Sequence, residues 1–384
     1  MTERLPRPSA TLGRVPFALT LAAGLAIFAC GTVLQIEDDP PTPADAGDAG
    51  LQPDACPLDL SSSADNCARC GRSCLGKACR DAMCEAQLLT QGYGSIRNIA
   101  LDDDAVYFTS TDQWMLGRVG KDGGVGTALV PEGGLKEPTS GLQADGAYVY
   151  ASAYTAGGGA GARRVAKNGG AQEPIDTCNT AWGIAVDATD VYWLTGICGG
   201  RPRVRRRAKE EPDAAATVTS AQDDADLYPY AVSGDTALDD TDVYWMSTRQ
   251  LKKLPKVGIE GGLPSTVFEP TPADGDHFRA LAVADRLYAV LGDRVIAVPK
   301  GGGAATVLAD AAPNKTLTRA AIVVAGGEVY FTRPEAGIVA RVPATGGSVE
   351  TLAKGQAMPT GLAIDAQYIY WSNAGDGTIW RVAR

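Results

Sequence analysis

The chain has 384 residues, of which 45% are apolar and 21% are charged. This composition excludes disorder of the whole chain and a protein that crosses a membrane many times, because both need a more one-sided sequence. The formal net charge is −10, from 45 acidic and 35 basic residues, so electrostatic binding to nucleic acid is disfavoured. The sequence contains a single histidine, which leaves little material for a histidine-based metal centre or catalytic triad. We therefore expect no metal, no cofactor and no nucleic-acid partner.

The N-terminal segment has the layout of a secretory signal. Residues 1–14 contain three arginines, and the largely apolar residues 15–29 follow them. A basic start followed by an apolar run directs a chain into the export pathway, and its basic end stays in the cytoplasm. We assign residues 1–29 to the signal peptide and predict that the rest of the chain is exported.

The end of this segment reads Ile27-Phe28-Ala29-Cys30-Gly31 and resembles the lipobox of bacterial lipoproteins. The resemblance implies cleavage before Cys30, a diacylglyceryl thioether on its sulfur, and acylation of the new amine. Three acyl chains exceed what stable membrane anchoring needs. Gly31 after the cysteine favours the outer membrane within the cell envelope. As an alternative, residues 15–36 could span a bilayer as an uncleaved anchor.

A linker and a cysteine cluster come next. Residues 30–54 hold the lipidated cysteine and the stretch EDDPPTPADAGDAGLQP, which is rich in proline, alanine and acids and is expected to be disordered. Residues 55–84 have too few apolar side chains for a core, so cross-links must hold them together. The cysteines of this module are Cys56, Cys67, Cys70, Cys74, Cys79 and Cys84.

Two chemistries suit the cysteine module. The spacing of Cys67 and Cys70, with further cysteines after them, is compatible with zinc or iron–sulfur ligation in a reducing compartment. In an exported chain, an even number of closely spaced cysteines favours three disulfides, whose pairing the sequence leaves open. The run DNCARCGRSCLGKACRDAMC resembles the short cysteine-rich modules that precede larger domains in some bacterial surface lipoproteins.

One sequence pattern returns seven times in residues 85–384. The last copy, GLAIDAQYIYWSNAGDGTIWRVAR, contains three runs in which β-branched and aromatic residues alternate with small or polar ones; other copies add a fourth run such as SVETLA. Repeats of about 40 residues with four strands each are typical of β-propellers. We predict an all-β, seven-bladed β-propeller with four-stranded blades. The central tyrosines are Tyr107, Tyr150, Tyr192, Tyr244, Tyr288, Tyr330 and Tyr370.

Two local features support this architecture. The seventh copy stops after its third strand, and residues 85–94 match a fourth strand, so we predict that they close the ring by pairing with residues 378–383. In five copies an aspartate precedes the tyrosine by five residues, in a tight connection where a short acid bonds its own backbone. Those acids are Asp102, Asp145, Asp187, Asp239 and Asp365.

The repeats resemble those of the YWTD, NHL and streptogramin-lyase propellers, most visibly in Val191-Tyr192-Trp193, Val243-Tyr244-Trp245 and Ile369-Tyr370-Trp371. The resemblance implies the fold and says little about activity. Streptogramin lyases use a histidine base with acidic and metal-binding partners, and only His277 is available here. No further histidine completes that site, so we favour a protein without catalytic activity and assign no catalytic residue.

Two further segments lead to predictions. The basic residues 201–209 are interpreted as a solvated edge strand, with a phosphate site as the alternative. Cys178 and Cys198 lie in loops that the propeller geometry places on one face, and we predict a disulfide between them.

The loops that precede the first strands are expected to converge around the central channel and to carry aromatic and arginine side chains, which supply most binding hot spots. The leading hypothesis is a lipid-anchored, non-catalytic propeller of the cell envelope that binds a protein, peptide or glycan there. Alternatives are a lyase or hydrolase acting on an exported substrate and a structural part of an envelope assembly. The candidate binding residues are Arg97, Trp182, Tyr228, Tyr230, His277, Arg279 and Arg319.

Overall fold

The structure is a computed structural model that describes residues 60–135, 138–153, 161–176, 181–195, 203–210, 217–218, 235–247, 249–257, 263–271, 277–310 and 318–384. The chain divides into two compact units, Met1–Asp54 and Ala55–Arg384, and all of these residues belong to the second. The predictions for the signal peptide, Cys30, the linker and Cys56 therefore lie outside the described residues. Within those ranges there is no helix long and apolar enough to cross a membrane.

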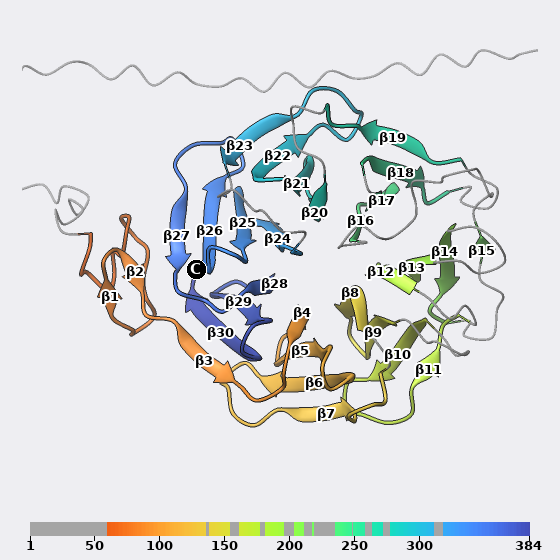
Figure 1. Ribbon diagram of the computed structural model, residues 1–384, viewed down its shortest axis with the longest axis horizontal. Coiled ribbons are helices and arrows are strands. Elements are labelled where there is room, and N and C mark those ends of the chain that lie inside the picture. The colour runs from red at the N-terminus through yellow and green to blue at the C-terminus, as the bar shows by residue number, and fades with distance from the viewer. Residues whose placement is uncertain are drawn as a thin grey trace, which may run out of the picture. The chain divides into compact units, whose positions relative to one another are not determined.

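Seven four-stranded sheets surround a central axis and form a β-propeller, as the repeat pattern predicts (Figure 1). In blades 1 to 6 the strands follow chain order across each sheet, and the first strand lies nearest the axis (Figure 1). Neighbouring strands are antiparallel, which short turns allow. Radial repetition of this kind leaves only short sheet edges exposed.

The first three blades contain strands of two to seven residues. Blade 1 contains β4 (Ile96–Leu101), β5 (Ala105–Ser110), β6 (Met115–Gly120) and β7 (Thr127–Val130). Blade 2 contains β8 (Pro138–Ala144), β9 (Tyr148–Ala153), β10 (Ala162–Ala166) and β11 (Glu173–Pro174). Blade 3 contains β12 (Ala181–Val186), β13 (Asp190–Thr195), β14 (Arg203–Ala208) and β15 (Thr217–Val218).

The next three blades repeat this order. Blade 4 contains β16 (Thr236–Leu238), β17 (Asp242–Met246), β18 (Leu251–Pro255) and β19 (Ser265–Phe268). Blade 5 contains β20 (Phe278–Val283), β21 (Leu287–Leu291), β22 (Arg294–Val298) and β23 (Thr306–Asp310). Blade 6 contains β24 (Ile322–Ala325), β25 (Glu328–Arg333), β26 (Ile338–Pro343) and β27 (Glu350–Ala353).

Blade 7 joins the two ends of the ring. It combines β28 (Pro359–Ile364), β29 (Tyr368–Asn373) and β30 (Thr378–Ala383) with β3 (Gln87–Thr90), which comes from the N-terminal side of the repeats. Strand β3 pairs antiparallel with β30 and forms the outer strand of this sheet (Figure 1). The predicted closure of the ring is confirmed.

The repeat tyrosines form the core between the blades. All seven are at most 1% exposed, and each packs against apolar side chains of the following blade. Tyr107 of blade 1, for example, packs with Leu142 and Val149 of blade 2. Because burial of one large side chain contributes about 1.5–3 kcal/mol, this repeated contact is a principal source of the ring's stability.

In five of the seven blades, an ion pair to a neighbouring blade accompanies this packing. In blade 1, Asp102 accepts hydrogen bonds from the backbone N–H of Asp104 and Ala105, as the sequence predicts. Asp102 also accepts the hydroxyl of Tyr107 at 2.7 Å and pairs with Lys167 of blade 2 at 2.8 Å. The same interblade ion pair recurs in Lys121–Asp365, Lys209–Asp145, Lys256–Asp187 and Lys300–Asp239.

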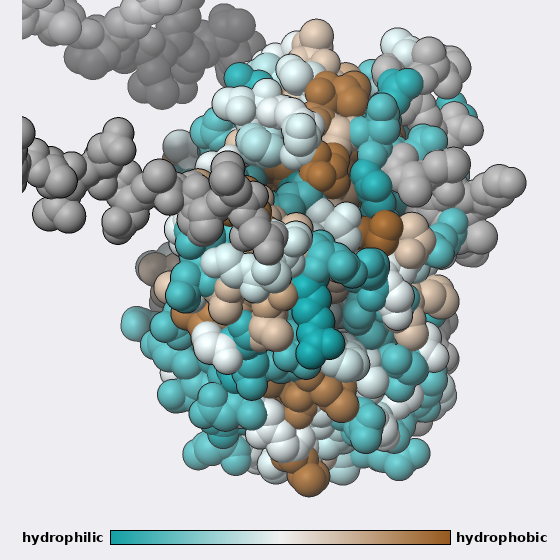
Figure 2. Space-filling view, turned by 90° about the vertical axis from the view of Figure 1, so that its left-hand side faces the viewer, coloured by the Kyte–Doolittle hydropathy of each residue, from teal (hydrophilic) through white to brown (hydrophobic). Residues whose placement is uncertain are grey.

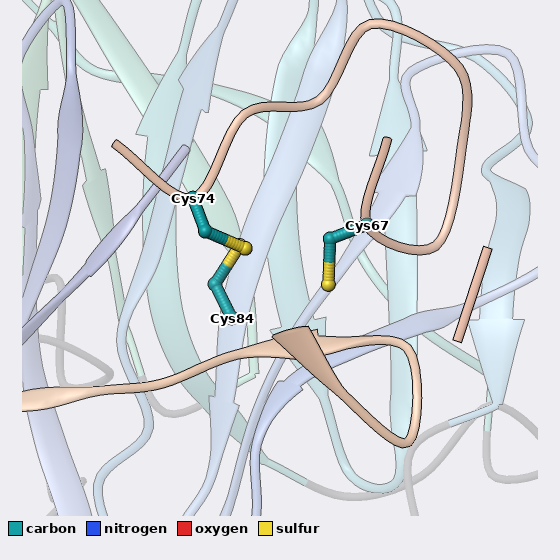
Figure 3. A group of neighbouring side chains, drawn as sticks. All are labelled: Cys67, Cys74 and Cys84. Carbon is teal, nitrogen blue, oxygen red and sulfur yellow. A yellow bond between two sulfur atoms is a disulfide. The ribbon is translucent and has the colours of Figure 1, made fainter. Parts of the chain in front are cut away.

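The cysteine module has one small hairpin, β1 (Cys79–Arg80) and β2 (Met83–Cys84), and two of its disulfides are described. They join Cys67 to Cys79 and Cys74 to Cys84, and Cys70 is disulfide-bonded as well. The Sγ atoms of Cys67, Cys74 and Cys84 lie within 4.8 Å of one another (Figure 3). Because these sulfurs are oxidised in disulfides, they do not offer the thiolates that zinc requires.

The module contacts the propeller through Arg72. Its guanidinium donates to Glu350 of β27 at 2.6 Å and to the carbonyl oxygen of Ala383 in β30 at 3.3 Å. Arg341 of β26 binds the other carboxylate oxygen of Glu350 at 2.6 Å. The module therefore joins blades 6 and 7 beside the seam where β3 closes the ring. On this side of the molecule, hydrophobic residues form separate groups among hydrophilic ones (Figure 2).

The basic segment of blade 3 is not a solvated edge strand. Strand β14 is the third strand of its sheet, and β15 pairs with its outer side. Arg205 pairs with Asp176 at 2.9 Å, and Arg206 makes two hydrogen bonds to Asp190, at 2.8 and 3.2 Å. The edge-strand interpretation is wrong because β15 covers the outer side of β14, and Arg205 and Arg206 pair with the buried carboxylates of Asp176 and Asp190.

Candidate functional site

One end of the ring gathers two sets of loops. In blade 1 the start of β4 pairs with the end of β5, since Ile96 lies opposite Ser110; in blade 7 Pro359 lies opposite Asn373. The loops that lead into the inner strands and the turns between second and third strands therefore share this end. We call it the mouth face.

The central channel holds a cavity of about 160 Å³ near the mouth face. Residues from all seven blades line it, most of them from the first half of an inner strand or from just before it. Apolar side chains such as Leu142, Ile184 and Val323 form part of the wall. The polar lining residues are Asn98, Ser140, Gln143, Asp235, Thr236, Arg319 and Thr360.

A ring of small residues brings the inner strands together here. At Gly361 a Cβ atom would lie 2.4 Å from Ser372 Oγ and 3.1 Å from the carbonyl oxygen of Arg97 in the next blade. Side chains at this position therefore have little room. The equivalent residues of four other blades are also glycine or alanine, namely Gly141, Gly183, Ala280 and Ala321.

Two blades have a larger polar residue at this position, and a single arginine binds both of these residues. Asn98 in blade 1 and Asp235 in blade 4 occupy the position that is glycine or alanine elsewhere. Arg319, which precedes β24 in blade 6, reaches into the channel, pairs with Asp235 at 2.7 Å and donates a hydrogen bond to Asn98. The three residues form a polar bridge across the channel.

The bridge pairs one negative with one positive charge, and a neighbouring arginine supports its backbone. Burial raises the pKa of the Asp235 carboxyl, while Arg319 and the backbone N–H of Leu281 oppose that rise. Arg279 donates to the carbonyl oxygen of Thr318 at 3.1 Å and so supports the backbone next to Arg319. Arg279 is itself 5% exposed, and burial lowers its pKa. Arg279 is therefore buried beside the bridge and supports it.

Three buried polar atoms at the cavity have no hydrogen-bond partner among the described residues: Ser140 Oγ, Thr236 Oγ1 and Arg319 Nε. They belong to residues of blades 2, 4 and 6 that line the cavity, but the atoms themselves have almost no accessible surface. An unpaired buried polar group costs about 1–3 kcal/mol, and native structures contain few of them. Because these atoms are buried, they are not open to a ligand in the cavity.

The structure separates the other predicted binding residues. Arg97 is exposed at the start of β4. Trp182 is half-buried and packs on the core between blades 3 and 4. His277 is half-buried, does not line the cavity, and has no partner for its Nδ1 among the described residues. The remaining predicted residues, Tyr228, Tyr230, Cys178 and Cys198, lie outside the described residues.

Two exposed apolar residues on the mouth face escaped the sequence analysis. Trp114, in the turn between β5 and β6, is 37% exposed and has a φ of 49°; Met358, just before β28, is 42% exposed and has a φ of 59°. Both backbones are left-handed, a conformation that costs a non-glycine residue about 1–2 kcal/mol. Blades 6 and 7 place Gly337 and Gly377 at the position of Trp114, with φ of 64° and 66°. Aligning the repeats at this turn would have revealed the exception.

No protein-family model matches the chain, and no curated protein matches its sequence. Solved structures share its fold. Virginiamycin B lyase from Staphylococcus aureus is 18% identical with a TM-score of 0.60, over 78% of this chain and 98% of the lyase. A streptogramin B lyase is 14% identical with a TM-score of 0.59, over 78% of this chain and 97% of that one.

A third similar structure is the extracellular domain of a putative one-component system from B. thetaiotaomicron. It is 10% identical with a TM-score of 0.56, over 77% of this chain and 39% of that one. At such identities the likeness shows the propeller fold alone, and that fold hosts unrelated functions. Evidence for function therefore comes from the residues of the mouth face.

Proposed function

We propose that this protein is a non-catalytic propeller, tethered in the cell envelope, that binds a protein, peptide or glycan partner at the mouth face. Trp114 carries the proposal. An indole at a left-handed position where two other blades use glycine is unfavourable for the fold, and such local strain clusters at functional sites. Exposed tryptophan is also among the side chains that most often dominate binding energy.

The surroundings of Trp114 suit an interface. Met358 adds a second exposed apolar side chain in the neighbouring blade 7, and Arg97 adds an exposed guanidinium in blade 1. Contacts connect blades 7 and 1 at this end, since a Cβ at Gly377 would lie 2.1 Å from the carbonyl oxygen of Gly94. An aromatic, a thioether and an arginine on one rigid face match the composition of protein interfaces.

Export and tethering rest on chemistry at the other end of the chain. The disulfides Cys67–Cys79 and Cys74–Cys84 are stable in oxidising compartments and rare in the cytosol. This fits the basic and apolar N-terminal pattern of a secretory signal. In the proposal, Cys30 carries the lipid anchor, the outer membrane is the site of attachment, and the linker after it spaces the propeller from the membrane.

The cavity favours binding over catalysis. Among the described residues its lining has one carboxylate, Asp235, and Arg319 already pairs with it, so this part of the lining offers no free acid and base pair. A structure of the Staphylococcus aureus lyase with quinupristin is of a catalytically inactive variant in which a histidine is replaced by alanine. In this chain the single histidine, His277, lies outside the cavity lining.

A pair of matched variants tests the proposal. The full chain in detergent is used to capture partners from its own envelope extract, and Trp114→Gly is compared with Val125→Gly. Val125 is 93% exposed in the loop between β6 and β7, at the opposite end of the same blade. We expect Trp114→Gly to lose the partner and Val125→Gly to retain it, with both variants folded by circular dichroism. Equal capture by the two variants would contradict the proposal.

A further inference from the structure

Met358 does not follow the repeat pattern at its position. When the inner strands are aligned at Gly361, Met358 lies three residues before this glycine, in the loop that enters β28. None of the equivalent described residues in other blades has a long apolar side chain; they are Ser95, Pro138, His277 and Thr318. A thioether at this position is therefore a feature of blade 7 and not of the propeller repeat.

Backbone hydrogen bonds hold Met358 in place, while its side chain stays at the surface. Its N–H donates to the carbonyl oxygen of Gln356 at 3.1 Å, and its own carbonyl oxygen accepts from the N–H of Ala374 at 2.9 Å. The side chain of Gln356 in turn accepts from the indole N–H of Trp371 at 2.8 Å. Met358 is nevertheless 42% exposed, so the loop fixes the thioether on the mouth face without covering it.

Met358 also has the most accessible thioether in the part of the chain that the structure describes. Met115 and Met246 are 5% and 3% exposed, and Met83 is half-buried. The described cysteines are all in disulfides. Because the susceptibility of a sulfur to oxidation follows its exposure, an oxidant that reaches the folded protein should react first at Met358.

Resting on the proposed binding function, we propose that Met358 is an oxidation site through which hydroperoxides weaken partner binding at the mouth face. The sulfur attacks the terminal oxygen of the hydroperoxide, an S–O bond forms, and the O–O bond breaks. The proton of the attacked oxygen moves to the departing oxygen. The thioether thus loses two electrons and becomes a sulfoxide, while the hydroperoxide is reduced to water or an alcohol.

The sulfoxide differs from methionine in the property that an apolar contact uses. A thioether is apolar and flexible, so it adapts to the partner surface that covers it. A sulfoxide adds a polar oxygen, which is unfavourable when a partner buries it without a hydrogen-bond donor. Methionine sulfoxide reductases restore the thioether, so the change is reversible. An exported protein meets hydroperoxides outside the reducing cytosol.

Peptide mass spectrometry tests the modification itself. The full chain in detergent is treated with hydrogen peroxide for increasing times, catalase then removes the peroxide, and oxygen addition is quantified at each methionine and tryptophan. We expect Met358 to gain one oxygen about tenfold faster than Met115 and Met246. Earlier oxidation of another described methionine, or of Trp114, would overturn the proposal.

Partner capture tests the consequence of the modification. The oxidised and the untreated chain are compared in capture from the protein's own envelope extract. We expect the oxidised chain to capture about fivefold less partner, and treatment with methionine sulfoxide reductase to restore capture. Unchanged capture at complete oxidation of Met358, or a loss that the reductase does not reverse, would overturn the proposal.

Two variants locate the effect within the chain. Met358→Leu removes the sulfur at nearly constant volume, so its capture should not change after peroxide, whatever its starting level. Met83→Leu, in the cysteine module, should respond to peroxide as the unmodified chain does. Loss of capture by oxidised Met358→Leu, or resistance of Met83→Leu, would place the effect at another residue and overturn the proposal.

Failure of this proposal can be told from failure of the proposed function. If Trp114→Gly loses the partner while peroxide leaves capture by the unmodified chain unchanged, the mouth face binds the partner and only the oxidation inference fails. If the untreated chain captures nothing through Trp114, the binding function fails and the oxidation inference fails with it.

Discussion

The aspartate in the tight turn of a blade combines three contacts on one side chain. In blade 2, Asp145 accepts from two backbone N–H groups, from the hydroxyl of Tyr150 at 2.7 Å, and pairs with Lys209 of blade 3 at 2.8 Å. Burial alone would raise the pKa of this carboxyl, but these hydrogen bonds outweigh burial and lower the pKa to about 2. The shift measures how strongly the folded ring favours the ionised acid.

Neutralising one of these acids should destabilise the ring. For Asp102→Asn we expect a loss of about 1–3 kcal/mol in the free energy of unfolding, because the variant leaves Lys167 without its charge partner and weakens bonds to the turn. Asp103→Asn is the control, since Asp103 is exposed in the same turn. Urea unfolding of both variants measures the effect, and equal stabilities would show that the ion pair contributes nothing.

The same acids predict how stability depends on pH. Hydrogen bonds lower the pKa values of Asp102, Asp145 and Asp239 against the opposing effect of burial. A carboxyl with a lowered folded pKa contributes fully above its unfolded pKa of about 3.9 and loses that contribution as the pH falls through the folded value. We expect the free energy of unfolding to be flat from pH 6 to 5 on this account and to fall steeply from about pH 4 toward 2. Urea titrations at each pH should show a shallower fall for Asp145→Asn, and an unchanged slope would contradict the assignment.

At the scale of elements, the cysteine module and β3 act on the same seam. Arg72 lies between Cys67 and Cys74, so the two disulfides hold the loop that inserts it between blades 6 and 7. Its side chain is fully buried, and burial lowers its pKa to about 10 although Glu350 opposes this. Through Arg72 the cysteine module therefore links blades 6 and 7 next to the closing strand β3.

Removing the contacts of Arg72 should destabilise the whole ring. We expect Arg72→Met to lower the free energy of unfolding by about 1–3 kcal/mol, because Glu350 keeps Arg341 as a partner but loses a buried charge-assisted bond. The control is Arg80→Met, since Arg80 is exposed in the same module. Thermal unfolding with and without dithiothreitol provides the second comparison. Reduction should lower the Tm of the unmodified chain more than that of Arg72→Met, and an equal drop would show that the disulfides do not act through Arg72.

At the scale of the whole molecule, the features repeated along the chain could be predicted, and those that join distant blades could not. The blades follow from strand periods around the repeat tyrosines, and the closure follows from a missing fourth strand in the last copy. The channel bridge gave no such signal, because Arg319 meets residues 84 and 221 positions away. The arginines of β14 looked solvated for the same reason, since Asp176 lies 29 positions before Arg205.

Residue type alone does not predict where the fold places a side chain, because the backbone conformation decides that as well. Arg279 and Trp182 have the side chains of binding residues, yet the fold uses them to support a loop and to fill the core between blades. Trp114 was missed because the favoured residue at its left-handed position is glycine. Comparing each turn across the repeats identifies such exceptions, and on this chain they point to the mouth face.

Site-specific photo-crosslinking in intact cell envelopes can show whether the mouth face holds the partner. A photoreactive phenylalanine analogue is placed at Trp114 in one strain and at Val125 in another, and adducts are compared by mass after irradiation. Both positions are exposed in blade 1 and lie at opposite ends of it. We expect one defined adduct from position 114 and none from position 125. Adducts from both positions alike, or from position 125 alone, would contradict it.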